Sequence, residues 1–145
     1  MSKGDRLYNK ATKLALQDEY NPKEVIELLV TAIEKYRNGK AAYALATWYL
    51  FGKHVKKNFT KGFELLQMSI DWDPSKEAYF NIAYSYEAGK GVDKDLKKAF
   101  QYYLLAALYG DKQAKREVGR CLYYGIGIAK NKELGLKITN LFDTE

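Results

Sequence analysis

The stretch from Ala78 to Tyr109 decides the fold of this chain, and it reads AYFNIAYSYEAGKGVDKDLKKAFQYYLLAALY. Small and apolar residues recur at helical spacing in two segments on either side of a Gly-Lys-Gly-Val loop. These residues are Ala78, Ile82, Ala83 and Tyr86, followed by Ala99, Tyr102, Tyr103 and Ala106. The stretch therefore predicts two helices joined as a hairpin. Because one hairpin cannot bury both of its apolar faces alone, the pattern also predicts further copies.

Such copies are present on both sides of the stretch. Ala41 lies 37 residues before Ala78, and Ala114 lies 36 residues after it. The same two shifts align three residues whose side chains can cap the start of a second helix: Asn58, Asp95 and Asn131. They also align three small residues at which two helix backbones could approach closely: Gly62, Ala99 and Gly135. Recurrent caps and recurrent small residues together indicate a repeat protein.

This pattern resembles the Sel1-like repeat family, which is related to the tetratricopeptide repeats. In the second copy the resemblance is carried by Ala78, Ile82-Ala83, Tyr86, Gly89-Lys90-Gly91-Val92, Lys98-Ala99 and Ala106-Ala107. It covers residues 40 to 142 and implies an all-α, right-handed α-solenoid of about four helix-turn-helix repeats. In the first clear copy His54 stands where the second loop glycine is expected, so we expect a differently shaped loop there.

The repeats predict one domain over residues 1–145. It would comprise a degenerate N-terminal hairpin over 1–39, with Asn21 capping its second helix, and repeats over 40–74, 75–111 and 112–145. No helix is expected after the last apolar face, which is formed by Ile138, Leu141 and Phe142. We expect that face either to pack against its neighbours or to stay open to a partner, which allows self-association through the C-terminal helix.

Cysteine usage and the N-terminal sequence favour a cytoplasmic location. Cys121 is the single cysteine, so an internal disulfide is impossible. The first ten residues are polar and contain no apolar segment typical of a signal peptide. No window approaches the eighteen apolar residues of a membrane span.

The sequence contains no convincing enzymatic constellation. His54 is the only histidine, which rules out a histidine cluster around a metal. Cys121 lies in a first helix at a position that should be packed, so we expect a core residue rather than a nucleophile. The segment Gly89-Lys90-Gly91 closes a loop, because its copies lose the lysine or a glycine. We therefore expect no catalysis, no metal and no cofactor.

The formal net charge is +6, and lysines recur at the loops and second-helix starts of successive copies. Stacked repeats would align these lysines along one edge, called here the basic edge: Lys53, Lys56, Lys57, Lys90, Lys94, Lys97 and Lys98. One interpretation is a solvated edge that aids solubility. The other is a docking surface for an acidic partner.

The resemblance also implies that first helices line a concave groove. On this basis the groove residues are Phe80, Tyr84 and Glu87. Their copies are Tyr43, Thr47 and Leu50, with Phe51 adjacent, and Arg116, Arg120 and Tyr123, with Tyr124 adjacent. The groove would be aromatic and become basic toward the C-terminus. Tyr and Arg are frequent in binding hot spots. The alternative is that several of these aromatic side chains pack between adjacent first helices.

The leading hypothesis is a non-catalytic protein-binding module, acting as an adaptor or as a dedicated inhibitor such as an immunity protein of a toxin. The expected partner is a protein or peptide with acidic and apolar character. The alternative is a nucleic-acid-binding protein that uses the basic edge and the aromatic groove. Eighteen acidic residues interleaved with the lysines argue against nucleic acid.

Overall fold

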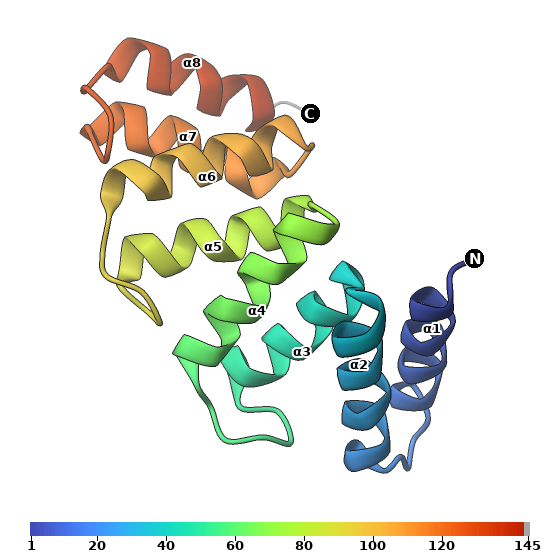
Figure 1. Ribbon diagram of the computed structural model, residues 1–145. Coiled ribbons are helices and arrows are strands. Elements are labelled where there is room, and N and C mark those ends of the chain that lie inside the picture. Colours follow the sequence, from blue (N-terminus) through green and yellow to red (C-terminus); the bar gives the residue numbers. More distant parts are fainter. Residues whose placement is uncertain (144–145) are drawn as a thin grey trace. The chain divides into compact units, whose positions relative to one another are not determined.

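The computed structural model describes the backbone of residues 1–143 and the side chains of residues 1–141. In that part of the chain every regular element is an α-helix, and there are eight (Figure 1). Their bounds are α1 Lys3–Ala15, α2 Pro22–Tyr36, α3 Gly39–Phe51, α4 Phe59–Trp72, α5 Lys76–Ala88, α6 Leu96–Leu108, α7 Lys112–Tyr124 and α8 Lys132–Asp143. The prediction of an all-α chain is confirmed.

Each second helix of the clear copies begins at the predicted cap. The side-chain oxygens of Asn58, Asp95 and Asn131 accept hydrogen bonds from the third backbone N–H that follows each of them, all at 3.0 Å. Asn21 likewise accepts from the N–H of Lys23 at 3.0 Å. A side-chain acceptor at this position satisfies an amide that has no partner within the helix, which is why the helices start there.

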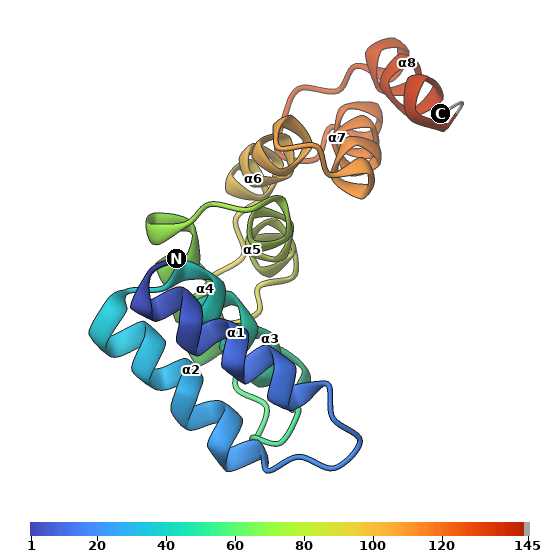
Figure 2. The same ribbon diagram turned by 90° about the vertical axis from the view of Figure 1, so that its right-hand side faces the viewer.

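The chain forms two compact units, residues 1–74 and 75–145. In the N-terminal unit α1 pairs with α2 and α3 pairs with α4, and α2 packs against α3. In the C-terminal unit α5 pairs with α6 and α7 with α8, while α6 packs against α7 (Figures 1 and 2). Each unit therefore contains two successive helical hairpins. The grouping of all residues into one domain stays a prediction.

Small residues let the two helices of each hairpin approach closely. A Cβ added at Gly62 would lie 2.6 Å from Leu50 Cδ2, and a Cβ added at Gly135 would lie 2.7 Å from the carbonyl oxygen of Gly119. Both distances are shorter than real Cβ contacts. At Gly62 the Leu50 side chain would have to move, whereas at Gly135 the contact is with backbone, so a larger residue there would force the helices apart. In the middle copy Ala83 and Ala99 are completely buried. The aligned small residues therefore mark helix contacts, as predicted.

The predicted stripes form the core of the α5–α6 hairpin. Ala78, Ile82 and Ala83 are inaccessible to solvent, and Tyr86 is buried. On α6 the fully buried positions are Ala99, Tyr103 and Ala106. Tyr102 is only half-buried, and its ring stacks on that of Tyr86 with the centroids 5.7 Å apart and the planes at 14°. Among the described residues no buried side-chain polar atom lacks a hydrogen-bond partner.

The prediction of a differently shaped loop at His54 is wrong. Gly91 and Gly127 occupy the same loop position in the other copies and have φ of 77° and 69°. His54 adopts the same left-handed conformation with φ of 58°. Its Nε2 lies 2.8 Å from the Tyr20 hydroxyl, and its ring centroid lies 5.3 Å from that of Trp48. These contacts help to hold a conformation that a side chain ordinarily disfavours.

Candidate functional site

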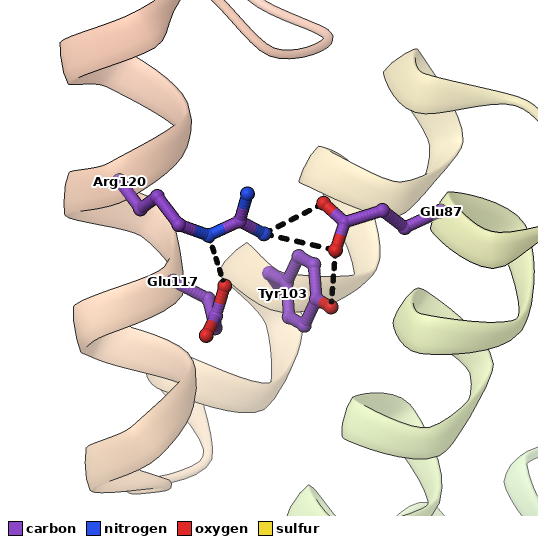
Figure 3. A network of polar contacts seen from close by, with 4 residues as sticks. All are labelled: Glu87, Tyr103, Glu117 and Arg120. Atoms are coloured by element: carbon purple, nitrogen blue, oxygen red, sulfur yellow. Dashed lines mark hydrogen bonds and ion pairs between the residues drawn. The ribbon is translucent and has the colours of Figure 1, made fainter.

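A network of polar side chains joins α5, α6 and α7 in the C-terminal unit (Figure 3). Arg120 on α7 donates from Nη2 to both carboxylate oxygens of Glu87 on α5, at 2.9 and 2.6 Å. Its Nε donates to Glu117 Oε2 at 2.6 Å, one helical turn earlier on α7. The hydroxyl of Tyr103 on α6 donates to Glu87 Oε1 at 3.3 Å. Hydrogen bonds to Glu87 on one side and to Glu117 on the other therefore fix the plane of the Arg120 guanidinium.

The network shifts the pKa of Arg120 and that of Tyr103. Burial lowers the pKa of Arg120, but hydrogen bonds and charge attraction from Glu87 and Glu117 outweigh it, so the pKa of Arg120 lies above its ordinary value. Burial is the main cause of the raised pKa of Tyr103, and the negative charge of Glu87 adds to it. Arg120 therefore stays charged, and Tyr103 stays neutral at every physiological pH.

These side chains form the floor of a hollow of about 470 Å³. We call it the Arg120 pocket, and its lining is Phe80, Asn81, Tyr84, Glu87, Tyr103, Gln113, Glu117 and Arg120. Tyr103 is 1% exposed, whereas Tyr84 is 45% exposed at the wall. The pocket thus combines a hydrogen-bonded charged floor with aromatic walls, of which Tyr84 is exposed.

A second hollow of about 390 Å³ lies between α7 and α8. We call it the Tyr123 hollow, and it is lined by Arg116, Glu117, Gly119, Arg120, Tyr123, Tyr124, Leu136 and Thr139. The rings of Tyr123 and Tyr124 meet edge to face, with their centroids 4.8 Å apart. Tyr124 is 65% exposed and Leu136 is 51% exposed, so apolar surface is accessible here.

The structure divides the predicted groove residues between the two units. Phe80, Tyr84, Glu87, Arg116, Arg120, Tyr123 and Tyr124 line the two hollows of the C-terminal unit. Tyr43, Thr47, Leu50 and Phe51 belong to α3 in the N-terminal unit. Of these, Leu50 packs against Gly62, and Phe51 is 73% exposed. One continuous groove through all eleven residues stays a prediction.

Two features of the site were missed from the sequence. Arg120 was expected to present its charge to a ligand, but Glu87 and Glu117 already compensate that charge. Glu87 and Arg120 are 33 residues apart, so no helical spacing reveals the pair. Tyr103 was expected only as a core residue, yet its hydroxyl also supports Glu87.

The lysines of the basic edge are exposed, except for the half-buried Lys90. Several lie over aromatic rings of their own repeat. Lys53 Nζ is 5.7 Å from the Trp48 centroid, and Lys98 Nζ is 5.4 Å from that of Tyr86. Lys90 Nζ is 5.2 Å from the Tyr84 centroid. Cation–π attraction therefore gives part of this edge a packing role in addition to its charge.

Reactive groups are buried or isolated. Cys121 is completely inaccessible, and burial raises the pKa of its thiol to about 11, which fits the predicted core role. Within the described residues no three His, Cys, Asp or Glu side chains gather as metal ligands. None of the described helices combines the length and apolar character required to cross a membrane.

The helical hairpins, the small-residue contacts and the left-handed loop residues together define an all-α protein of repeated helix-turn-helix units. The family model of the Sel1 repeat matches residues 39–71, 76–111 and 112–138. The chain therefore belongs to the Sel1 repeat family. Sel1 repeat proteins are protein-interaction modules and are typically non-catalytic scaffolds.

Similar proteins come from several sources. Protein sel-1 homolog 2 of Mus musculus is 27% identical over 135 residues, which are 92% of this chain and 19% of that protein. A Sel1 repeat protein from Oxalobacter formigenes has the same fold, with a TM-score of 0.83, 24% identity and coverage of 97% of this chain and 58% of that one. The immunity protein Pa5087 from Pseudomonas aeruginosa has a TM-score of 0.65 and 27% identity, and the match covers 99% of this chain and 54% of that one.

These matches confirm the helical solenoid class for this chain. The chain spans about a fifth of the length of the curated relatives it matches, and little more than half of these two solved chains.

Proposed function

We propose that this chain is a non-catalytic protein-binding module whose partner contacts the exposed faces of α5 and α7. The observation that carries the proposal is the pair of hollows along these two first helices. Their walls are aromatic and their charged groups are held in place, which is typical of binding surfaces. Tyr124 is the best anchor, because it offers a large accessible ring beside Leu136.

Among binding roles, the likeness to an immunity protein supports a dedicated inhibitor of a toxin. An adaptor role would use the same surface. The two roles differ in a growth assay: cells that produce a toxin encoded beside the gene for this chain should survive only when the chain is also produced. Survival without the chain, together with retained partner binding, would favour the adaptor.

A partner with acidic and apolar groups was predicted for the whole groove. Within the groove such a partner fits the Tyr123 hollow best, because Arg116, Tyr124 and Leu136 line it together. The exposed Leu136 and Leu141 on α8 also support self-association as a prediction. The side chain of Phe142 lies outside the described residues.

A nucleic-acid partner is less well supported, because lysines of the chain already lie over the rings of Trp48, Tyr84 and Tyr86.

The test is affinity capture from extract of the native cells, followed by measurement of Kd with the purified partner. Tyr124→Ala should weaken binding by about tenfold or more, because removal of a hot-spot aromatic typically costs about 2 kcal/mol. Tyr36→Ala on α2 is the matched control, since Tyr36 is 42% exposed and outside both hollows. Equal capture of the partner by both variants would mean that the partner binds elsewhere on the chain.

Cell fractionation would test the predicted cytoplasmic location.

A further inference from the structure

The Arg120 pocket contains one positive and two negative side chains. Glu87 and Glu117 each carry a carboxylate, and Arg120 carries the only formal positive charge on the described lining. The charged floor therefore has a formal charge of −1. An anionic ligand could reach Nε or Nη2 of Arg120 only by displacing Glu117 or Glu87, and it would then face both released carboxylates. Nη1 of Arg120 makes no hydrogen bond among the described residues and could donate to an acidic group, but the net negative charge of the floor disfavours such a group.

Two polar atoms of the floor remain unused by the described residues. Glu117 accepts through Oε2, while its Oε1 makes no hydrogen bond there. Arg120 donates through Nε and Nη2, while its Nη1 makes none. In Figure 3 no dashed line reaches either atom. The free carboxylate oxygen can accept a bond from a donor that enters the pocket, and a charged donor forms the stronger bond.

The aromatic walls favour the same kind of ligand. The ring of Phe80 meets that of Tyr103 at 67° with the centroids 5.5 Å apart, which fixes its orientation. One cation is already held at the Tyr84 wall, because Lys90 Nζ lies 5.2 Å from the ring centroid and donates to the Tyr84 hydroxyl at 3.3 Å. A ligand would therefore use the ring surface that Lys90 leaves open. Aromatic faces attract ammonium and guanidinium groups, and their apolar surface can pack the aliphatic part of a long side chain.

We propose that the Arg120 pocket receives a basic side chain, lysine or arginine, from the protein partner. The charged end would donate to Glu117 Oε1, and the aliphatic stem would pack between Phe80 and Tyr84. Opposite charges would then alternate along Glu87, Arg120, Glu117 and the ligand. The volume of about 470 Å³ leaves ample room for one such side chain. The inference rests on the proposed function, since it names the chemistry of the partner at this part of the surface.

The test uses three small probes: the Nα-acetyl N-methylamides of lysine, norleucine and glutamate. Each is titrated into the isotope-labelled full chain while the backbone amide signals of Tyr84, Glu117 and Arg120 are followed by NMR. The lysine probe should produce saturable shifts at these three amides. The norleucine probe should bind about tenfold more weakly, because it lacks the charge-assisted hydrogen bond. The glutamate probe should not bind there.

Two variants test the assigned contacts. Glu117→Gln should weaken the lysine probe by about tenfold, and Glu133→Gln is its control, because Glu133 is exposed on α8 and outside the pocket. Tyr84→Leu removes an aromatic wall while keeping every charge, so it keeps the test valid if Glu117→Gln fails to fold. It should also weaken the lysine probe.

Three outcomes overturn the inference: no saturable shift with the lysine probe, equal binding of the glutamate probe, or unchanged lysine binding in a folded variant of Glu117 or Tyr84. If any of these occurs while Tyr124→Ala still reduces capture of the partner, the binding function stands and only the basic ligand is excluded.

Discussion

At the scale of single residues, the packing of each hairpin depends on small residues, alanine and glycine, at the contacts between its helices. Ala83 on α5 is completely buried, and its counterpart Gly119 on α7 lies directly against Gly135 and Thr139 of α8. The repeat register indicated this, because Ala46 and Gly119 occupy the same place in the other copies.

We predict that Ala83→Leu lowers the free energy of unfolding by about 1–3 kcal/mol, the usual cost of overpacking a tight contact. Ala88→Leu is the matched control, because Ala88 is exposed near the end of the same helix. Urea denaturation of both variants measures the difference. Equal stabilities would mean that Ala83 is not at the helix contact.

His54 shows what the register could not provide. The alignment indicated a missing glycine, but it gave no sign that Tyr20, 34 residues earlier, would contact the imidazole. We predict that His54→Val destabilises the chain by about 1–2 kcal/mol more than His54→Asn, because a β-branched residue strongly disfavours φ of 58° whereas Asn tolerates it. Thermal melting of both variants would measure the difference. Equal melting temperatures would contradict the left-handed conformation.

At the scale of helices, the sequence was sufficient wherever the signal was local. Caps at Asn58, Asp95 and Asn131 and the apolar stripe from Ala78 to Tyr86 depend on residues within a few positions of each other. The Glu87–Arg120 pair links α5 to α7, and it depends on how two repeats stack. The repeat spacing therefore identified Glu87 and Arg120 as residues of the binding groove, but it could not show that their charges neutralise each other.

Removal of a cap tests the local part of this account. Asp95→Ala should cost about 1 kcal/mol of stability, because the N–H of Lys98 loses its acceptor. Asp93→Ala, in the exposed loop just before the cap, should cost much less. Chemical denaturation compares the two variants, and an equal loss would indicate a general charge effect rather than capping.

The same hairpin should respond to alkaline pH. The pKa of Tyr103 is raised in the folded chain above its ordinary value of 10.0, chiefly by burial. Its contribution to stability is therefore fully present below about pH 10 and is lost as the pH rises toward the folded pKa. Tyr103→Phe should show a weaker loss of stability above pH 10 than the unmodified chain. Parallel curves for the two proteins would contradict the burial of this phenol.

At the scale of the whole molecule, the open question is whether the two compact units unfold together. Each contains about half of the 145 residues, and domains of that size bury a smaller fraction of their surface than larger domains and are marginally stable alone. The sequence predicts a single domain because 145 residues suit one domain and the repeat copies continue on both sides of the break at Pro74. Register is a property of the chain, however, and says nothing about the energy that couples one hairpin to the next.

Arg120→Gln, a change in the C-terminal unit, tests whether the two units unfold together. The change leaves Glu87 and Glu117 without their shared cation and should cost about 1–2 kcal/mol, moderated by solvent because the side chain of Arg120 is 36% exposed. Lys137→Gln removes only an exposed ion pair with Glu133 and should cost little. Hydrogen exchange is the measurement. If the chain unfolds as one domain, the most protected amides of α2 and α3 should lose as much protection as those of α5 and α7. A loss confined to α5–α8 would mean that the two units unfold independently and would contradict the single-domain prediction.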